Sequence, residues 1–183
     1  MAPERISVVG SSGSGKSTFG RRVAERLGCS CVELDALHHL ADWQPRDPDE
    51  FAAAVADATP ADGRWVVEGN YRQVTMEGVV WQRADTVVVY DLPRRVVMSQ
   101  LVRRTVRRWV RREELWNGNR ESLRNMVSRD PELNVVLWSW THYDDYAERY
   151  QLAGTDPRWV HLEFVYLTSH AEADAWLDAL IAD

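Results

Sequence analysis

Short apolar runs alternate along this chain with longer segments in which apolar residues recur every three or four positions. The runs are rich in β-branched residues and mostly continuous, which is typical of strands in a parallel sheet that is covered on both faces. We predict strands from these runs at residues 6–9, 31–34, 64–68, 86–90 and 160–167.

Residues that start and stop helices mark the segments between these strands. Residues 18–27 are helix-forming and end before Gly28, a residue that commonly ends helices. Later helices are predicted from residues that cap helix N-termini, with Pro next or Glu three positions on. These caps are Asp47 (followed by Pro48 and Glu50), Ser169 (followed by Glu172) and Asp130, which precedes Pro131 and whose helix is expected to run to about Tyr150. Alternating strands and helices predict an α/β domain.

Composition agrees with one globular domain. The chain has 183 residues, of which 45% are apolar, so a full hydrophobic core is expected. The net charge is −6, and no apolar run reaches the roughly 18 residues of a membrane helix. Residues 1–5 lack the pattern of a secretory signal, and Cys29 and Cys31 are too few for a disulfide framework. We therefore expect a cytoplasmic protein with reduced thiols and no membrane contact.

One motif is highly specific. Residues 10–17, Gly-Ser-Ser-Gly-Ser-Gly-Lys-Ser, match G-x-x-x-x-G-K-[ST] between a predicted strand and a predicted helix. In such a loop, backbone N–H groups surround phosphates, the lysine reaches the β- and γ-phosphates, and the Ser17 hydroxyl binds Mg²⁺. Lys16 is the only lysine beside 21 arginines, which indicates that this position requires a compact ammonium group. The predicted ATP and Mg²⁺ site comprises Gly10, Ser12, Gly13, Ser14, Gly15, Lys16, Ser17 and Thr18.

Other classes of P-loop protein do not fit the chain. A GTPase reads guanine with an N-K-x-D element, which needs a second lysine. Motor ATPases and helicases are larger and usually have a strand that ends in paired acids, which neither 65–69 nor 87–92 supplies. A small phosphotransferase remains.

An arginine-rich segment stands out between the fourth and fifth predicted strands. Residues 94–129 contain eleven arginines and three acids, in a protein that is acidic as a whole. Helical spacing gathers six of the arginines on one half of a helix and predicts an apolar face made by Met98, Val102, Val106, Trp109 and Val110. Beside a phosphate-binding loop, the guanidinium face suits phosphates. We expect Arg104, Arg108 and Arg120 to act there, on a lid that closes when ATP binds.

In order and spacing, the motifs resemble the adenylate-kinase-like branch of P-loop kinases, and most closely the small bacterial DNA topology modulation proteins. The matching stretches are the P-loop, the arginine segment, 34–38 (Leu-Asp-Ala-Leu-His), 67–72 (Val-Glu-Gly-Asn-Tyr-Arg) and 90–93 (Tyr-Asp-Leu-Pro). The resemblance implies a P-loop NTPase fold of three layers, α/β/α, with a five-stranded parallel sheet and ATP as donor. The single domain would span 1–183, with an acceptor-binding insertion at 36–62 and the lid at 94–129.

The resemblance also implies roles for acidic and basic residues that follow the strands. Glu68 would lie near Mg²⁺, ahead of Asp91 as a metal-site acid, and Arg72 near the transferred or acceptor phosphate. Asp35 would accept the proton of a substrate hydroxyl, as in shikimate-type kinases, or else support Mg²⁺ or cap a helix. The segment 36–62 has only Arg46 as a base, which argues against AMP as the acceptor.

Three further points stay open at the level of sequence. Trp43 and Trp116, flanked by polar residues, either stack on a substrate ring or belong to the core. The acceptor is a nucleotide, a nucleoside or another small hydroxyl metabolite. The alternative function is a nucleotide-dependent regulator that binds nucleic acid through the arginine face.

Cys29, Cys31, His38 and His39 are not expected to bind zinc, because the histidines lie beyond the strand that carries the cysteines.

Overall fold

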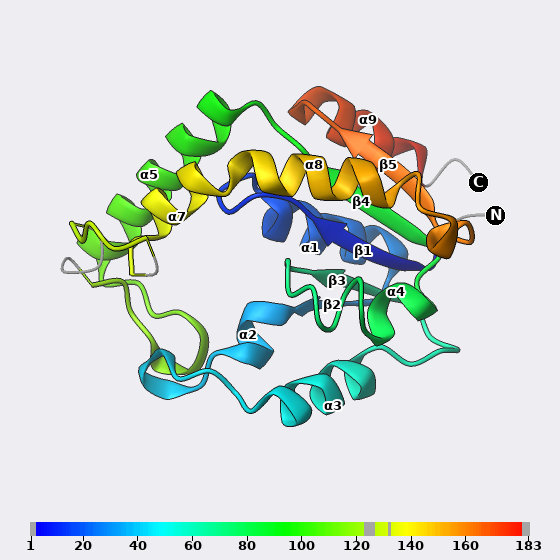
Figure 1. Ribbon diagram of the computed structural model, residues 1–183, viewed down its shortest axis with the longest axis horizontal. Coiled ribbons are helices and arrows are strands. Elements are labelled where there is room, and N and C mark those ends of the chain that lie inside the picture. Colours follow the sequence, from blue (N-terminus) through cyan, green and yellow to red (C-terminus); the bar gives the residue numbers. More distant parts are fainter. Residues whose placement is uncertain (1–2, 123–126, 132, 181–183) are drawn as a thin grey trace.

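A five-stranded, all-parallel sheet forms the centre of the protein (Figure 1). The computed structural model describes residues 3–122, 127–131 and 133–180. The strand order is β2-β3-β1-β4-β5, and the strands are β1 (Arg5–Val9), β2 (Ser30–Glu33), β3 (Trp65–Glu68), β4 (Thr86–Tyr90) and β5 (Glu163–Leu167). Since β1 lies in the middle, the loop that follows it opens at the centre of the carboxyl edge of the sheet, where ligands bind in folds of this type.

Helices cover both faces of the sheet. One core cluster packs α1 (Lys16–Leu27) and α9 (His170–Ala179) on residues such as Ile6 and Val88. The other packs α3 (Pro48–Ala58), α4 (Val79–Arg83) and α8 (Tyr143–Ala153) on residues such as Val67 and Val87. The other helices of the described residues are α2 (Leu34–His38), α5 (Arg94–Arg111) and α7 (Val135–Thr141), with single 3₁₀ turns at Ala41–Trp43, Trp116–Gly118 and Pro157–Trp159. The predicted three-layer α/β/α fold is confirmed.

Most of the predicted boundaries hold. Gly28 ends α1 in a left-handed conformation, and the Asp47 carboxylate accepts hydrogen bonds from the N–H groups of Asp49 and Glu50 at the start of α3. Ser169 caps α9 by accepting from the N–H of Glu172. The fifth strand is shorter than expected, because residues 160–162 form a turn in which the Leu162 N–H donates to the Trp159 carbonyl at 2.9 Å.

The prediction of one helix from Asp130 to about Tyr150 was wrong. Helix α7 begins only at Val135, and Asn134 is its cap, accepting from the N–H groups of Val136 and Leu137. A break at His142 separates α7 from α8. The His142 ring stacks on Trp138 with centroids 3.9 Å apart. An amide cap and an aromatic stack, neither visible as a period in the sequence, set these boundaries.

The predicted apolar face of the arginine helix was also wrong. The buried residues of α5 are Val97, Leu101 and Thr105. They form the stripe that packs on the phosphate-binding loop, where a Cβ on Gly13 would lie 2.7 Å from the Cβ of Leu101. Except for half-buried Met98, the expected face is exposed: Val102 by 44%, Val106 by 43%, Trp109 by 40% and Val110 by 65%. Arg104 and Arg108 follow Leu101 and Thr105 by three residues, so they share the inward side of the helix.

Within the described ranges, no helix combines the length and the apolar character that crossing a membrane requires.

Candidate active site

The loop between β1 and α1 has the backbone of a phosphate-binding loop. Gly10, Gly13 and Gly15 all have positive φ angles, and a Cβ on Gly10 would come 2.4 Å from the Tyr90 carbonyl oxygen. Helix α1 begins at Lys16 directly after Gly15, so its free N–H groups and positive dipole end face the loop. The loop therefore has the geometry that the sequence motif predicts.

Asn70 braces this loop against the end of β3. Its side-chain amide donates to the Gly10 carbonyl at 2.6 Å, and its oxygen accepts from the Gly10 N–H at 3.1 Å. The Tyr150 hydroxyl also donates to the Asn70 oxygen, at 3.1 Å. No role for Asn70 is predicted from the sequence. A two-way amide contact with a glycine of the loop is a tertiary feature that no local pattern reveals.

Glu68 is a buried carboxylate at the last position of β3. It is 1% exposed, and neither of its oxygens has a hydrogen-bond partner in proper geometry among the described residues. Burial raises the pKa of Glu68, whereas the nearby Lys16 ammonium and Ser17 hydroxyl favour the charged form. A buried carboxylate without a partner, beside a hydroxyl, has the oxygen donors that Mg²⁺ prefers. These residues fit the predicted metal site.

Asp35 lies in α2, just beyond the end of β2, and is held by Tyr71. The Tyr71 hydroxyl donates to Asp35 Oδ1 at 2.7 Å and lies 3.3 Å from His39 Nε2. Burial and the Asp35 charge raise the pKa of Tyr71, so the phenol keeps its proton and remains a donor. The charge of Asp35 also acts on Glu68 and on Arg104. Asp35 thus lies close to the predicted metal site and to the arginine helix.

Two of the three predicted lid arginines face this centre. The Nε atoms of Arg104 and Arg108 are buried, with no hydrogen-bond partner in the part of the chain that the structure describes. Burial and the Arg108 charge lower the pKa of Arg104, whereas Glu121, Asp35 and Glu68 oppose this shift. Arg108 lies 3.7 Å from a Glu121 oxygen and 5.9 Å from the Trp116 ring centre. Guanidinium groups held inward without a full set of partners are suited to bind phosphate oxygens.

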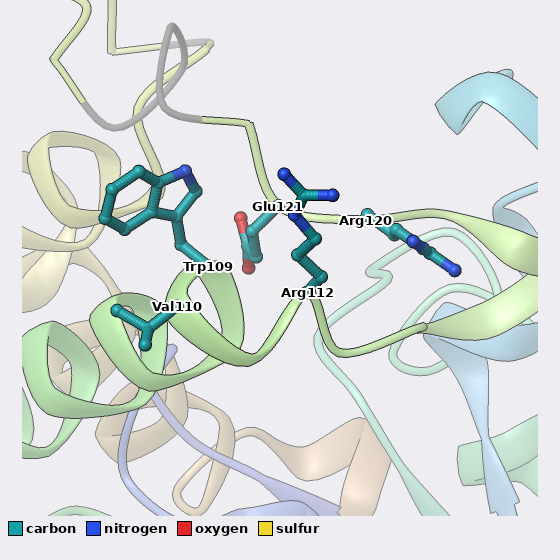
Figure 2. Close-up of a pocket in the computed structure, with 5 residues that line it drawn as sticks. All are labelled: Trp109, Val110, Arg112, Arg120 and Glu121. Carbon is teal, nitrogen blue, oxygen red and sulfur yellow. The ribbon is translucent and has the colours of Figure 1, made fainter.

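Two other predicted residues point elsewhere. Arg72 is 61% exposed and forms an ion pair with Glu77 at 2.7 Å. Arg120 is 54% exposed and forms an ion pair with Glu114 at 3.3 Å. Figure 2 shows Arg120 beside a shallow cavity at the C-terminal end of α5, outside the phosphate-binding loop, with a lining of Trp109, Val110, Arg112, Arg120 and Glu121.

The chain after α5 folds back onto the segment 36–62, the predicted acceptor-binding insertion. We call residues 115–120 the lid tip; in Figure 1 it descends as a yellow-green loop to the cyan chain that follows α2. Asn119, 4% exposed, accepts from the Trp43 N–H at 2.8 Å and donates to the Leu40 carbonyl at 2.8 Å. Asn117 donates to the His39 carbonyl, and the Trp43 indole donates to the Arg120 carbonyl at 3.3 Å. The predicted lid and the insertion are therefore fastened to each other.

Trp43 and Trp116 meet at this junction. Their ring centres are 6.5 Å apart, and the His39 ring lies 5.2 Å from Trp43 and 6.4 Å from Trp116. The Trp116 indole donates to Glu33 at 3.0 Å. Both indoles are partly buried. The sequence indicated these two tryptophans separately, and the fold places them in one aromatic group beside Tyr71.

Comparisons with known proteins agree with this architecture. No family model and no curated protein matches the chain. Among solved structures, the chain is similar to the shikimate kinase from Acinetobacter baumannii in complex with shikimate, with 16% identity, a TM-score of 0.55, and coverage of 97% of this chain and 90% of that one. The chain has the fold of the small P-loop kinases.

Two further structures share this fold. The shikimate kinase from Bacteroides thetaiotaomicron is 12% identical with a TM-score of 0.52, over 98% of this chain and 96% of that one. The deoxyadenosine kinase from M. mycoides with bound dATP is 11% identical with a TM-score of 0.50, over 96% and 98%. The expected resemblance to P-loop kinases holds at the level of the fold, whereas the comparisons do not support the closer likeness to DNA topology modulation proteins.

Proposed function

We propose that the protein is an ATP- and Mg²⁺-dependent kinase that transfers the γ-phosphoryl group to a hydroxyl of a small acceptor. One observation carries this proposal. The phosphate-binding loop, the buried Glu68, the tyrosine-bound Asp35 and the inward Arg104 converge at the carboxyl edge of one parallel sheet. Each of these groups matches a requirement of phosphoryl transfer, which needs positioning and charge stabilisation above all.

The residues divide the work by their chemistry. The loop N–H groups and Lys16 hold the β- and γ-phosphates of ATP. Asp35 accepts the proton of the acceptor hydroxyl, whose oxygen forms the new bond to the γ-phosphorus while ADP leaves with the electron pair of the broken P–O bond. Arg104 and Arg108 stabilise the negative charge on the transferred group. Both guanidinium groups are already partly desolvated, so their attraction for that charge is strong.

Glu68 and the Ser17 hydroxyl would hold Mg²⁺. The fit rests on the Glu68 oxygens, which are buried and lack partners within the described residues. When bound, the ion neutralises part of the phosphate charge. Burial raises the pKa of Glu68, and the nearby Lys16 ammonium opposes this shift and favours the carboxylate that the cation would need.

Release of ADP in the presence of Mg²⁺ and a panel of hydroxyl compounds tests the proposal. We expect slow release from ATP alone and a marked rise with a particular acceptor. Lys16→Arg is expected to lose this activity while remaining folded, because a planar guanidinium does not fit the loop. Arg26→Lys, an exchange at an exposed position of the same helix, is the matched control. Turnover by Lys16→Arg within a few-fold of wild type would contradict the catalytic role of the loop.

A second candidate function has one specific observation in its favour. Arg103, Arg107 and Arg111 follow one another at four-residue intervals on the exposed side of α5. Such a row suits the phosphates of a nucleic acid. A nucleic-acid-binding regulator would bind DNA with a steep salt dependence and would show no response to small acceptors. Fluorescence anisotropy with a labelled duplex across a salt series distinguishes the two functions.

A further inference from the structure

The acceptor side of the site is unusually poor in available positive charge. This side comprises α2, the chain to residue 46, and Tyr71. Its fixed charge nearest the phosphate-binding loop is the Asp35 carboxylate, close to a second carboxylate, Glu68. An acceptor with its own phosphate or carboxylate would therefore approach the Asp35 carboxylate at short range, where repulsion is strong because little water intervenes.

The arginines of this region are engaged elsewhere. Arg46 donates from Nε to the Leu37 carbonyl at 2.7 Å, which turns it back onto its own segment. Arg72 pairs with Glu77 on the surface, and Arg64 pairs with Glu4 at the opposite end of the sheet. None of the three forms a side-chain hydrogen bond or an ion pair with Asp35 or Tyr71 in the described structure. Nucleotide acceptors need fixed cations around their phosphate, and this segment presents none to the site.

The two histidines of the segment do not replace these cations. His38 and His39 lie next to Tyr71, with a ring-centre distance of 4.5 Å from His38 and 3.3 Å from His39 Nε2 to the phenol oxygen. Burial lowers the pKa of both imidazoles. The charged groups that face them are Asp35 and, through Trp116, Arg108. At neutral pH the histidines are uncharged polar groups.

The remaining surface of this side is aromatic. His39, Trp43 and Trp116 form one group of partly buried rings, and Tyr71 lies beside His39. On its other side Tyr71 packs on the buried core residue Phe51, at a ring-centre distance of 5.2 Å. Aromatic faces bind flat or apolar faces of a ligand and give little energy to an anion. Asp35 lies at the edge of this group, where it accepts a hydrogen bond from the Tyr71 hydroxyl.

We propose that the acceptor is an uncharged alcohol with a flat or apolar face, such as a nucleoside or a neutral sugar, and not a compound that carries a phosphate or carboxylate. The inference rests on the proposed kinase function. Asp35 meets the hydroxyl, the aromatic group meets the body of the acceptor, and the inward arginines serve the transferred phosphoryl group alone.

Matched pairs of compounds test this inference by kinetics. Adenosine is compared with AMP, thymidine with its 5′-monophosphate, and glucose with gluconate and with glucose 6-phosphate, by ADP release at saturating ATP. We expect kcat/KM to be at least about tenfold higher for the uncharged member of an active pair, a ratio that corresponds to about 1.4 kcal/mol. A charged member that equals or exceeds its uncharged partner would overturn the inference.

Binding of AMP provides a measure that needs no turnover. Protein saturated with a non-hydrolysable ATP analogue and Mg²⁺ is titrated calorimetrically with AMP. We expect no binding in the micromolar range, and Asp35→Asn is expected to weaken this exclusion because it removes the nearest negative charge. Micromolar binding of AMP to the wild-type complex overturns the inference while leaving the kinase proposal standing. Failure of the ATP analogue itself to bind would instead contradict the proposed function.

Discussion

Gly13 of the phosphate-binding loop lies against Leu101 of the arginine helix, so closely that a Cβ on Gly13 would come 2.7 Å from the Leu101 Cβ. The Val97 carbonyl oxygen would be 3.0 Å away on the same side. The loop that holds phosphates and the helix that carries Arg104 and Arg108 are therefore in direct contact through a glycine. The position of α5 depends on this close approach.

Gly13→Ala is expected to destabilise the protein by about 2–4 kcal/mol, because the methyl group adds overpacking to the strain of a positive φ angle. Gly28→Ala is the matched control: its φ is +65° and nothing lies within 4 Å of the added Cβ. The control is expected to lose only about 1 kcal/mol, from backbone strain alone. Urea unfolding of both variants checks the difference, and equal losses would show that the contact with Leu101 contributes nothing.

Arg104→Gln is expected to reduce kcat by about a hundredfold or more, through loss of charge stabilisation in the transition state. The same change is expected to raise the melting temperature of the ligand-free protein, because burial lowers the pKa of Arg104 and its charge is held at a cost. Arg103→Gln, on the exposed side of the helix, is the control for helix propensity and net charge. If the two variants have the same kcat and the same melting temperature, Arg104 neither stabilises the transition state nor carries a destabilising buried charge.

Asp35→Asn is expected to cut kcat by about a hundredfold with little change in KM, as a general base acts mainly in the transition state. Arg72→Ala is expected to stay near wild type, because its side chain pairs with Glu77 at the surface. Steady-state kinetics with an active acceptor distinguish the two. A rise in KM for Arg72→Ala together with normal rates for Asp35→Asn would instead indicate an acceptor that is recognised through a phosphate.

Glu68→Gln is expected to flatten the pH dependence of stability in the absence of Mg²⁺. Burial raises the pKa of Glu68 from its ordinary value of 4.5, so the folded protein binds this proton more tightly than the unfolded chain does. The resulting stability is fully present below the unfolded pKa and is lost as the pH rises through the higher folded pKa. Urea unfolding from about pH 4 to about pH 8 should show wild type losing stability relative to the variant. A constant difference across that range would mean that Glu68 titrates as an ordinary carboxyl group.

The predicted lid is tested by amide hydrogen exchange over residues 100–122, with and without a non-hydrolysable ATP analogue and Mg²⁺. We expect protection to rise on binding, because phosphates neutralise the inward guanidinium groups. Exchange over 36–46 is expected to fall in parallel, since Asn119 joins the two segments. Asn119→Ala should uncouple them, whereas Asn117→Ala should do so less. Unchanged protection of 100–122 would mean that α5 does not close on ATP.

Local signals in the sequence were sufficient for most of the fold. The phosphate-binding loop, its glycines and the capped start of α3 each depend on neighbours within a few residues, and all were predicted in place. The buried side of α5 was not, because Val97 and Leu101 face a glycine loop brought close only by the tertiary fold. An apolar pattern indicates that a helix is amphipathic, but it does not indicate which side of the helix packs against the rest of the protein.

The same limit applies within the site. Roles for Asp35 and Glu68 were expected from the resemblance to P-loop kinases, and both acids lie at or beyond the carboxyl ends of neighbouring parallel strands. The hydrogen bond from Tyr71 to Asp35 joins residues 36 positions apart, and the hydrogen bond from Asn70 to Gly10 joins residues 60 positions apart. The local sequence around these residues does not indicate either bond. Arg72 is adjacent to Tyr71 in sequence, yet the turn at this point sends one side chain inward and the other to Glu77.

The contacts of the lid tip with the chain around Trp43 join the end of α5 to the segment that follows β2 and α2. We expect release of ADP and of the phosphorylated product to require that hydrogen bonds such as those of Asn119 break. Phosphoryl transfer is then expected to be faster than release of the products. When product release is the slow step, an enzyme shows a rapid first round of phosphorylation and then a slower steady-state rate.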